Sequence, residues 1–262
     1  MNEAAWNNGA NAALALKIPV LKPRLPAVEQ LLPYLQRIDA SRVYSNFGPL
    51  AREFGERLSH HFGLPQHGVI VAASGTAALT GAILATAGRA SQDRPVAIVP
   101  AFTFVATASA VEACGYRVQF ADVDPDDFVL DPARLLTEHA LDRVGLVIPV
   151  GAFGRAVDQA AWKAFRDETG IAVVIDGAAC FEIATSSPNR TFGDIPVAIS
   201  FHATKSFGVG EGGCVVTRDL NLATRVVRAI NFGFLGSRDC QSPNINGKLS
   251  EYHAAVGLAE LD

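Results

Sequence analysis

Ser200-Phe201-His202-Ala203-Thr204-Lys205-Ser206-Phe207-Gly208-Val209-Gly210-Glu211-Gly212-Gly213 is the stretch that decides the fold, because it sets one lysine between two expected strands. The apolar run 196–201 is typical of a buried strand, and the run 213–217 predicts the next one. Four glycines within 208–213 allow tight turns between them. We therefore expect Lys205 on a turn, where partial desolvation favours a neutral, nucleophilic amine. A surface lysine in a glycine-rich hairpin is the alternative reading.

The composition is that of a globular protein without a nucleic-acid or membrane surface. The chain has 262 residues, 49% of them hydrophobic, and a formal net charge of -4 with both signs mixed along it. No basic stripe and no apolar run of membrane-spanning length is present in the sequence. Residues 1–25 lack the profile of a signal peptide, so we interpret them as a flexible N-terminal leader and expect a cytoplasmic protein.

The cysteines indicate a reducing environment. Cys114, Cys180, Cys214 and Cys240 lie far apart and form no Cys-x-x-Cys pair. Three of them lie within or beside apolar segments. We expect reduced, mostly buried thiols, and neither zinc ligands nor disulfides.

Short apolar runs alternate with helical patterns along residues 26–262. Seven runs are expected to be strands: 69–73, 96–101, 117–123, 144–150, 172–176, 197–201 and 213–217. Helical spacing occurs in 26–37, 49–62, 77–87, 103–113, 132–141, 160–169, 220–230 and 249–262. Strands that are apolar on both faces and joined by crossover helices favour a mainly parallel sheet covered on both sides. The predicted fold is one α/β domain, a three-layer α/β/α sandwich around a seven-stranded sheet.

The first strand is followed by a candidate phosphate site. Ser74, Gly75 and Thr76 come directly after the run 69–73 and open the expected helix 77–87. Free backbone amides at a helix start suit a phosphate, and glycine allows its close approach. An ordinary N-cap serine or threonine would give the same pattern.

Two further strand ends carry groups that suit a planar cofactor. Phe104 follows the run 96–101 and could stack on a ring, although aromatics at strand ends are more often core residues. Asp176 ends the run 172–176, and a carboxylate there needs a cationic partner or else caps the residues that follow. Ligands of open α/β sheets bind beyond the carboxyl ends of the strands, where Ser200 and Lys205 also lie.

These groups together match the requirements of pyridoxal phosphate. A lysine forms a Schiff base with its aldehyde, a carboxylate keeps its ring nitrogen protonated, and a helix start holds its phosphate. Each feature alone is weak, whereas the set is moderately specific. The sequence therefore predicts a site for pyridoxal phosphate.

The chain also resembles the DegT/StrS family, the sugar aminotransferases of pyridoxal phosphate fold type I. The resemblance covers most of the chain from Asn46 onward. It rests on an ordered series of motifs: Ser74-Gly75-Thr76-Ala77-Ala78-Leu79, Pro100-Ala101-Phe102-Thr103-Phe104-Val105-Ala106-Thr107, Phe120-Ala121-Asp122-Val123-Asp124-Pro125, Asp176-Gly177-Ala178-Ala179, Ser200-Phe201-His202-Ala203-Thr204-Lys205 and Gly210-Glu211-Gly212-Gly213.

The resemblance implies the catalytic roles. Lys205 would be the Schiff-base lysine and proton shuttle, Asp176 the partner of the ring nitrogen, and Phe104 the residue stacked on the ring. The family's usual reaction moves an amino group from glutamate to a nucleotide-linked keto-sugar in two half-reactions. A lysine at position 205 argues against the family's dehydratase branch, which carries histidine there.

The resemblance also implies a phosphate site and a shared dimer site. Gly75, Thr76 and Ser200 would hold the cofactor phosphate. Asn246 and Lys248 are similar to the family's Asn-x-Arg/Lys loop, which reaches the phosphate in the neighbouring subunit. A homodimer is therefore expected.

Three departures from the family pattern leave a second reading open. Ala179 stands where the family usually has Gln or His, and Ser206 where Asn is common. The chain stops inside the helix that leads into the family's smaller C-terminal domain, so that domain is expected to be absent. The alternative to an aminotransferase is thus a degenerate homologue that binds pyridoxal phosphate, or only dimerises, without turnover.

No metal site is expected. We interpret His202 as a structural residue at a strand end, and His60 and His61 as part of a helix surface. None of these histidines has acidic or cysteine partners at ligand spacing.

Overall fold

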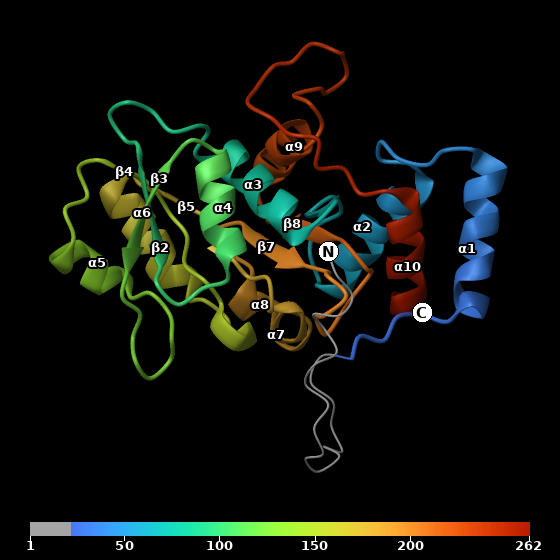
Figure 1. Cartoon of the computed structure of the whole chain (residues 1–262), viewed down its shortest axis with the longest axis horizontal. Coiled ribbons are helices and arrows are strands. Elements are labelled where there is room, and N and C mark those ends of the chain that lie inside the picture. The colour runs from blue at the N-terminus through green and yellow to red at the C-terminus, as the bar shows by residue number, and fades with distance from the viewer. Residues whose placement is uncertain (1–21) are drawn as a thin grey trace, which may run out of the picture.

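The computed structural model describes residues 22–262, and its strands run through the middle of the molecule with helices around them (Figure 1). The strands are β1 (Val69–Ala72), β2 (Val96–Pro100), β3 (Arg117–Ala121), β4 (Val144–Val147), β5 (Ala172–Val173), β6 (Ile175–Asp176), β7 (Val197–Ser200) and β8 (Gly213–Val216). All seven predicted strands are present. The predicted leader lies almost wholly outside the described residues.

The strands form two four-stranded sheets that meet within one predicted strand. Their orders are β3-β2-β4-β5 and β1-β8-β7-β6, and only β8 runs antiparallel to its neighbours. The expected strand 172–176 is divided into β5 and β6 at Val174, whose N–H donates to the Val147 carbonyl. In a regular parallel ladder the Val174 carbonyl would accept from residue 149, but Pro149 has no N–H.

The break at Val174 changes the number of strands from the seven that were predicted, while the predicted α/β class is confirmed. A bridge between Val150 and Asp176 carries the pairing across the break. The predicted single seven-stranded sheet is therefore eight strands in two joined sheets. Parallel pairing still predominates, because four strand pairs are parallel and two are antiparallel.

The helices match the predicted segments within a few residues. They are α1 (Val28–Ser41), α2 (Pro49–His61), α3 (Gly75–Thr86), α4 (Val105–Ala113), α5 (Pro132–Glu138), α6 (Gln159–Thr169), α9 (Leu220–Ala229) and α10 (Glu251–Leu261). Three short helices were not predicted: η2 (Ala152–Gly154), α7 (Phe181–Ser186) and α8 (Pro188–Thr191). Segments of six residues or fewer are too short to show a helical period in sequence.

Two hydrophobic clusters lie on opposite faces of the strands. Val69 and Val71 of β1 belong to a cluster that includes side chains of α2, α6, α7 and α10, whereas Ile70 and Ala72 belong to one that includes side chains of α3, α4 and α9. Successive strand side chains point to opposite faces, so each strand contributes to both clusters. The three-layer arrangement is thereby confirmed.

The cysteine thiols and the helix lengths can be compared with the predictions of buried thiols and of no membrane-spanning segment. Cys114, Cys180 and Cys214 are buried free thiols, as predicted, and Cys240 is exposed. Burial raises the pKa of Cys114 to about 11 and of Cys180 to about 12, which makes both thiols inert. No helix within residues 22–262 is both long enough and apolar enough to cross a bilayer.

Candidate active site

A cavity of about 510 Å³ lies at the carboxyl ends of β1, β6 and β7. It brings together six predicted site residues: Gly75, Thr76, Phe104, Asp176, Ser200 and Lys205. The other lining residues are Ser74, Leu79, Ala106, Ala178, His202, Thr204 and Glu211. Asn246 and Lys248, which were also predicted, do not line it.

The start of α3 forms one end of the cavity. The Ser74 side chain accepts a hydrogen bond from the Ala77 N–H at 3.0 Å and so caps the helix. The N-cap alternative is therefore correct for Ser74. The first N–H groups of a helix, here those of Gly75 and Thr76, have no partner inside the helix. The helix start remains able to receive an anion.

Glycine is required where α3 begins, because two strand ends crowd it. A Cβ added at Gly75 would lie 2.7 Å from Ser200 Cβ, and one added at Gly213 would lie 2.7 Å from the Gly75 nitrogen. Ser200 ends β7 and is buried, with its Oγ accepting from the His202 N–H at 3.2 Å. The close approach places the Ser200 hydroxyl beside the helix start.

Asp176 lies on the floor of the cavity at the end of β6 and is only 8% exposed. Thr107 Oγ1 donates to Asp176 Oδ2 at 2.6 Å, and the Ala178 N–H donates to Asp176 Oδ1 at 3.0 Å. Burial raises the pKa of Asp176, while these two hydrogen bonds and the charge of Lys205 oppose that rise. The predicted cationic partner is thus replaced, within the described residues, by two neutral donors.

Asp176 does not cap the next helix, because α7 begins at Phe181 with Cys180 at the N-cap position. Thr107, its main side-chain partner, was missed by sequence reasoning. The available signal was a second threonine four residues after Thr103, on the same face of the helix that follows β2.

Lys205 lies on the turn after β7, as predicted, and its side chain is partly buried and lines the cavity. Its N–H donates to the His202 carbonyl, which closes the turn. Backbone hydrogen bonds from Phe201 to Gly212 and from Ala203 to Gly210 hold the two arms together. The glycine-rich hairpin is therefore present, and it places Lys205 in the same cavity as Asp176.

Phe104 precedes α4 at its N-cap position and is 78% exposed. This exposure rules out the alternative that Phe104 is a core residue. Its side chain lines the cavity, where a planar ring could pack against it.

Asn246 and Lys248 lie beside the cavity but interact with each other. Lys248 Nζ donates to Asn246 Oδ1 at 2.7 Å and lies 4.2 Å from the centre of the Phe232 ring. The Ala73 N–H donates to the Gly247 carbonyl, which fixes this segment at the carboxyl end of β1. Burial lowers the pKa of Lys248. Their predicted reach into a neighbouring subunit stays a prediction.

His202 follows the end of β7, and its role as a structural residue stays an interpretation. Its side chain lines the cavity, and its Nδ1 contacts Thr204 Oγ1 at 2.8 Å. His202 Nε2 lies 3.7 Å from Glu211 Oε1 on the opposite arm of the hairpin. Within residues 22–262, no group of three or more His, Cys, Asp or Glu side chains could hold a metal ion.

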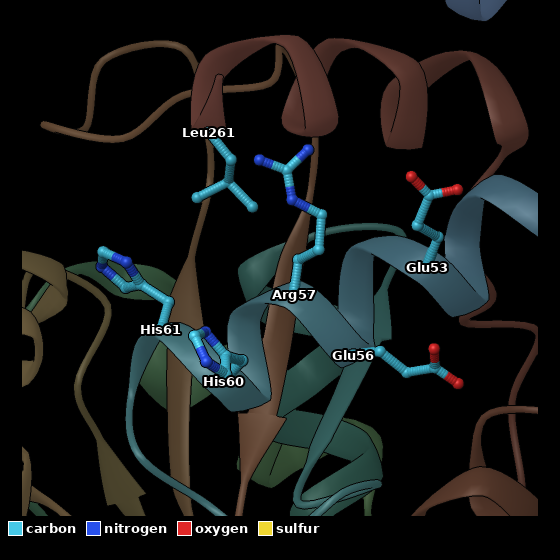
Figure 2. A pocket seen from close by; sticks show the side chains of 6 residues that line it. All are labelled: Glu53, Glu56, Arg57, His60, His61 and Leu261. Atoms are coloured by element: carbon cyan, nitrogen blue, oxygen red, sulfur yellow. The ribbon is translucent and has the colours of Figure 1, made fainter.

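A second hollow of about 420 Å³ lies between α2 and the end of α10 (Figure 2). Its lining residues are Glu53, Glu56, Arg57, His60, His61 and Leu261. Two of the charged side chains that line the hollow already form ion pairs within the protein: Arg57 pairs with Asp262, and Glu53 pairs with Arg37. The hollow lies away from the strand ends that carry Asp176 and Lys205, so we assign the candidate site to the larger cavity.

Residues 27–262 match the DegT/DnrJ/EryC1/StrS aminotransferase family. The chain belongs to this family. It is 36% identical over 249 residues to Protein Rv3402c of Mycobacterium tuberculosis, covering 94% of this chain and 60% of that protein. It is 30% identical over 244 residues to the dTDP-4-amino-4,6-dideoxy-D-glucose transaminase of Shigella dysenteriae, covering 93% of this chain and 64% of that enzyme.

A solved structure from Bacillus cereus ATCC 10987, which carries the assignment PLP-dependent aminotransferase, superposes on this family member with a TM-score of 0.83. It is 32% identical in sequence, and the match covers 93% of this chain and 66% of that one. The chain therefore spans less than two thirds of the length of these relatives. The fold predicted from the sequence resemblance is confirmed.

Proposed function

We propose that this protein is a pyridoxal phosphate-dependent aminotransferase that moves an amino group from an amino acid to a nucleotide-linked keto-sugar. The observation that carries the proposal is that Lys205 and Asp176 line one cavity, at whose end α3 begins. The relative from Shigella dysenteriae, a dTDP-sugar transaminase, supports the substrate class. Glutamate is the amino donor that we expect from the family resemblance.

The residues present fit the cofactor. The cavity of about 510 Å³ falls within the range of small-molecule sites and has a carboxylate, an amine and a helix start at separate places. The contact of Gly75 with Ser200 leaves no room for a Cβ, as a close-packed phosphate cradle requires. Gly75, Thr76 and Ser200 would hold the phosphate, and Phe104 would lie against the ring. When bound, pyridoxal phosphate supplies an electron-accepting ring.

Lys205 and Asp176 would divide the proton chemistry between them. The Lys205 amine, set on its turn within the cavity, would take a proton from the substrate carbon and return it. Asp176 would hold a proton at the ring nitrogen through its buried, hydrogen-bonded carboxylate. The hairpin and β6 fix both groups in place, so neither has to be ordered during the reaction.

We further propose a cytoplasmic homodimer with shared sites. Asn246 and Lys248 lie outside the cavity of their own chain, at the carboxyl end of β1. In a dimer that placed this segment against the neighbouring cavity, the amide and the ammonium would add donors to the phosphate.

A second candidate function is a homologue that binds the cofactor or dimerises without turnover. One observation favours it. Ala179, where the family resemblance calls for Gln or His, provides no side-chain donor.

Absorbance spectroscopy separates these functions. Adding pyridoxal phosphate to the purified protein should produce a visible band that borohydride removes and that Lys205→Ala lacks. Lys163→Ala serves as the matched control, because Lys163 pairs with Asp167 on the exposed face of α6. Glutamate should then bleach the band in the aminotransferase. A band that no amino donor bleaches would establish the second candidate, and no band at all would exclude both cofactor functions.

A further inference from the structure

Two threonine hydroxyls form a chain that ends on Asp176. Thr103 Oγ1 lies 2.7 Å from Thr107 Oγ1, and Thr107 Oγ1 donates to Asp176 Oδ2 at 2.6 Å. Thr107 is fully buried on α4, and Thr103 is partly buried just before that helix. Thr103 comes directly before Phe104, the N-cap residue of α4, and there its hydroxyl lies against that of Thr107 in the first turn of the helix.

The direction of the hydrogen bonds depends on the charge of Asp176. A hydroxyl has one proton, so while Thr107 donates to an ionised Asp176 the bond between the two threonines must be one that Thr103 donates. If Asp176 were protonated and donated to Thr107, the bond between Thr107 and Asp176 would reverse, and Thr107 would be free to donate to Thr103. Thr103 strengthens the first arrangement, because hydrogen bonds in series polarise one another.

We infer that Thr107, supported by Thr103, is a positioning residue that keeps the Asp176 carboxylate ionised so that the cofactor ring nitrogen retains its proton. The inference rests on the proposed function. Burial alone favours a neutral Asp176, which could not hold a proton on the ring nitrogen. The Ala178 N–H, the other donor to the carboxylate, comes from the backbone and is kept by every substitution except proline.

The test compares Thr107→Val, which keeps the shape and removes the hydroxyl, with Thr107→Ser, which keeps the hydroxyl. Thr191→Val is the matched control, because Thr191 is also a buried threonine but its hydroxyl donates only to the Ile183 and Ser187 carbonyls. Three quantities are measured: the 15N signal of ring-labelled pyridoxal phosphate, the Kd of the cofactor, and the 13C carboxyl titration of Asp176 in the cofactor-free protein.

In Thr107→Val we expect the ring nitrogen signal to move toward unprotonated pyridine and Kd to rise about tenfold, the size of one lost hydrogen bond to a charged group. The titration of Asp176 should move to higher pH. Thr103→Val should shift all three quantities in the same direction by less. Thr107→Ser and Thr191→Val should stay within about twofold of the parent Kd.

Identical ring nitrogen signals and Asp176 titrations in Thr107→Val and the parent would overturn the inference, as would a serine variant that behaves like the valine variant. Failure of the parent to bind pyridoxal phosphate would instead overturn the proposed function. The titration in the cofactor-free protein would still decide whether Thr107 governs the charge of Asp176.

Discussion

At the scale of single residues, Asp176 combines burial with the need for a charge. Its fold-imposed surroundings raise its pKa, chiefly through desolvation, above the value that it has in the unfolded chain. Such a group stabilises the folded protein while the group is protonated in both states, at pH values below its pKa in the unfolded chain. This stabilisation is lost as the pH rises through the group's pKa in the folded protein. The ionised Asp176 carboxylate therefore destabilises the folded protein at neutral pH, and it is this ionised form that the proposed site requires.

We predict that Asp176→Asn becomes more stable relative to the parent as the pH rises from about 4 to 7, because the amide cannot ionise. Urea unfolding of both cofactor-free proteins across this range measures the difference. Asp167→Asn is the control, because hydrogen bonds from Lys163 and Arg166 lower the pKa of Asp167, so its pH dependence lies below about pH 4 and its difference from the parent should stay nearly constant across this range. A pH-independent difference for Asp176→Asn would contradict the prediction.

Gly75 gives a second prediction at this scale. Gly75→Ala would set a Cβ 2.7 Å from Ser200 Cβ, and overpacking of this kind destabilises proteins by about 1–3 kcal/mol. Ser200→Gly removes the atom that clashes, so the double variant should recover part of the loss. A double-mutant cycle by urea unfolding measures the coupling. Additive effects of the two substitutions would show that the contact is not the cause.

At the scale of elements, α2 is capped by a residue far along the chain. Gly48 precedes α2 and has no side chain to cap it. The fully buried Glu251 of α10 instead accepts from the Leu50 and Ala51 N–H groups at 2.8 and 2.9 Å. A Cβ at Gly48 would lie 2.5 Å from Glu251 Cδ, so glycine makes room for the distant carboxylate. The cap joins two helices that are 200 residues apart.

Glu251→Ala should lower the free energy of unfolding by about 3 kcal/mol, because two buried N–H groups lose a charged acceptor. Glu251→Gln keeps one acceptor oxygen and should lose less. Glu260→Ala, on the exposed face of the same helix, should stay within about 0.5 kcal/mol of the parent. Equal stabilities of the two Glu251 variants would argue against the charge as the stabilising feature.

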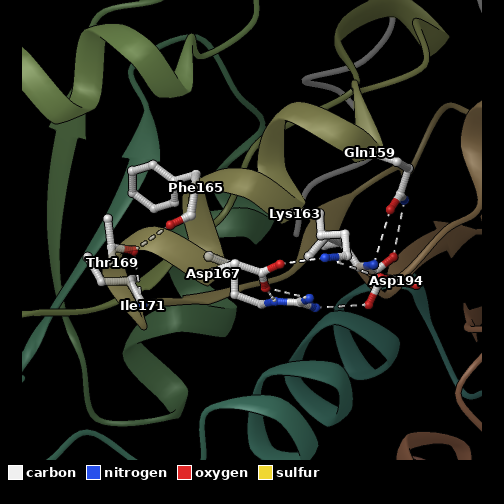
Figure 3. A network of polar contacts seen from close by, with 9 residues as sticks. Gln159, Lys163, Phe165, Asp167, Thr169, Ile171 and Asp194 are labelled. Atoms are coloured by element: carbon white, nitrogen blue, oxygen red, sulfur yellow. Dashed lines mark hydrogen bonds and ion pairs between the residues drawn. The ribbon is translucent and has the colours of Figure 1, made fainter.

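A side-chain amide joins α6 to the segment before β7 (Figure 3). Gln159 Nε2 donates to the Thr191 and Ile195 carbonyls at 2.9 and 3.1 Å, and its Oε1 accepts from the Ile195 N–H at 3.1 Å. This contact fixes the approach of the chain to β7, the strand that ends in Ser200 and leads to the lysine turn.

We expect Gln159→Ala to cost about 1–2 kcal/mol of stability, because partly buried backbone groups lose their partners. Lys163→Ala one turn later in the same network should cost less than about 0.5 kcal/mol, since it breaks only exposed ion pairs. Thermal and urea unfolding of both variants measure the difference. A larger loss in Lys163→Ala than in Gln159→Ala would refute this ranking.

At the scale of the whole molecule, the proposed dimer makes cofactor affinity depend on assembly. Asn246→Ala should weaken binding of pyridoxal phosphate about tenfold if the amide reaches the neighbouring phosphate. Asn244→Ala is the control, because Asn244 bonds only to Cys240 and Ser242 in the same loop. Equilibrium dialysis at protein concentrations on either side of the dimer dissociation midpoint measures both effects. Unchanged affinity in Asn246→Ala would count against the shared site.

The site could be predicted in part because its residues follow short, strongly apolar strands. Asp176, Ser200 and Lys205 were placed correctly, since parallel strands end at one edge and bring their next residues together. Thr107 could not be assigned to Asp176, because its contact joins residues 69 positions apart. Glu251 escaped prediction for the same reason, and its burial contradicts the usual exposure of glutamate.

By itself the sequence determined the α/β alternation and the glycine-rich turn that carries Lys205, because local periodicity and backbone freedom are properties of short segments. The tertiary structure alone decided the break at Val174, the hydroxyl chain that supports Asp176, the cap that Glu251 provides for α2, and the position of Asn246 and Lys248 outside the cavity. These features depend on distances between segments far apart in the chain, which packing of the two cores fixes.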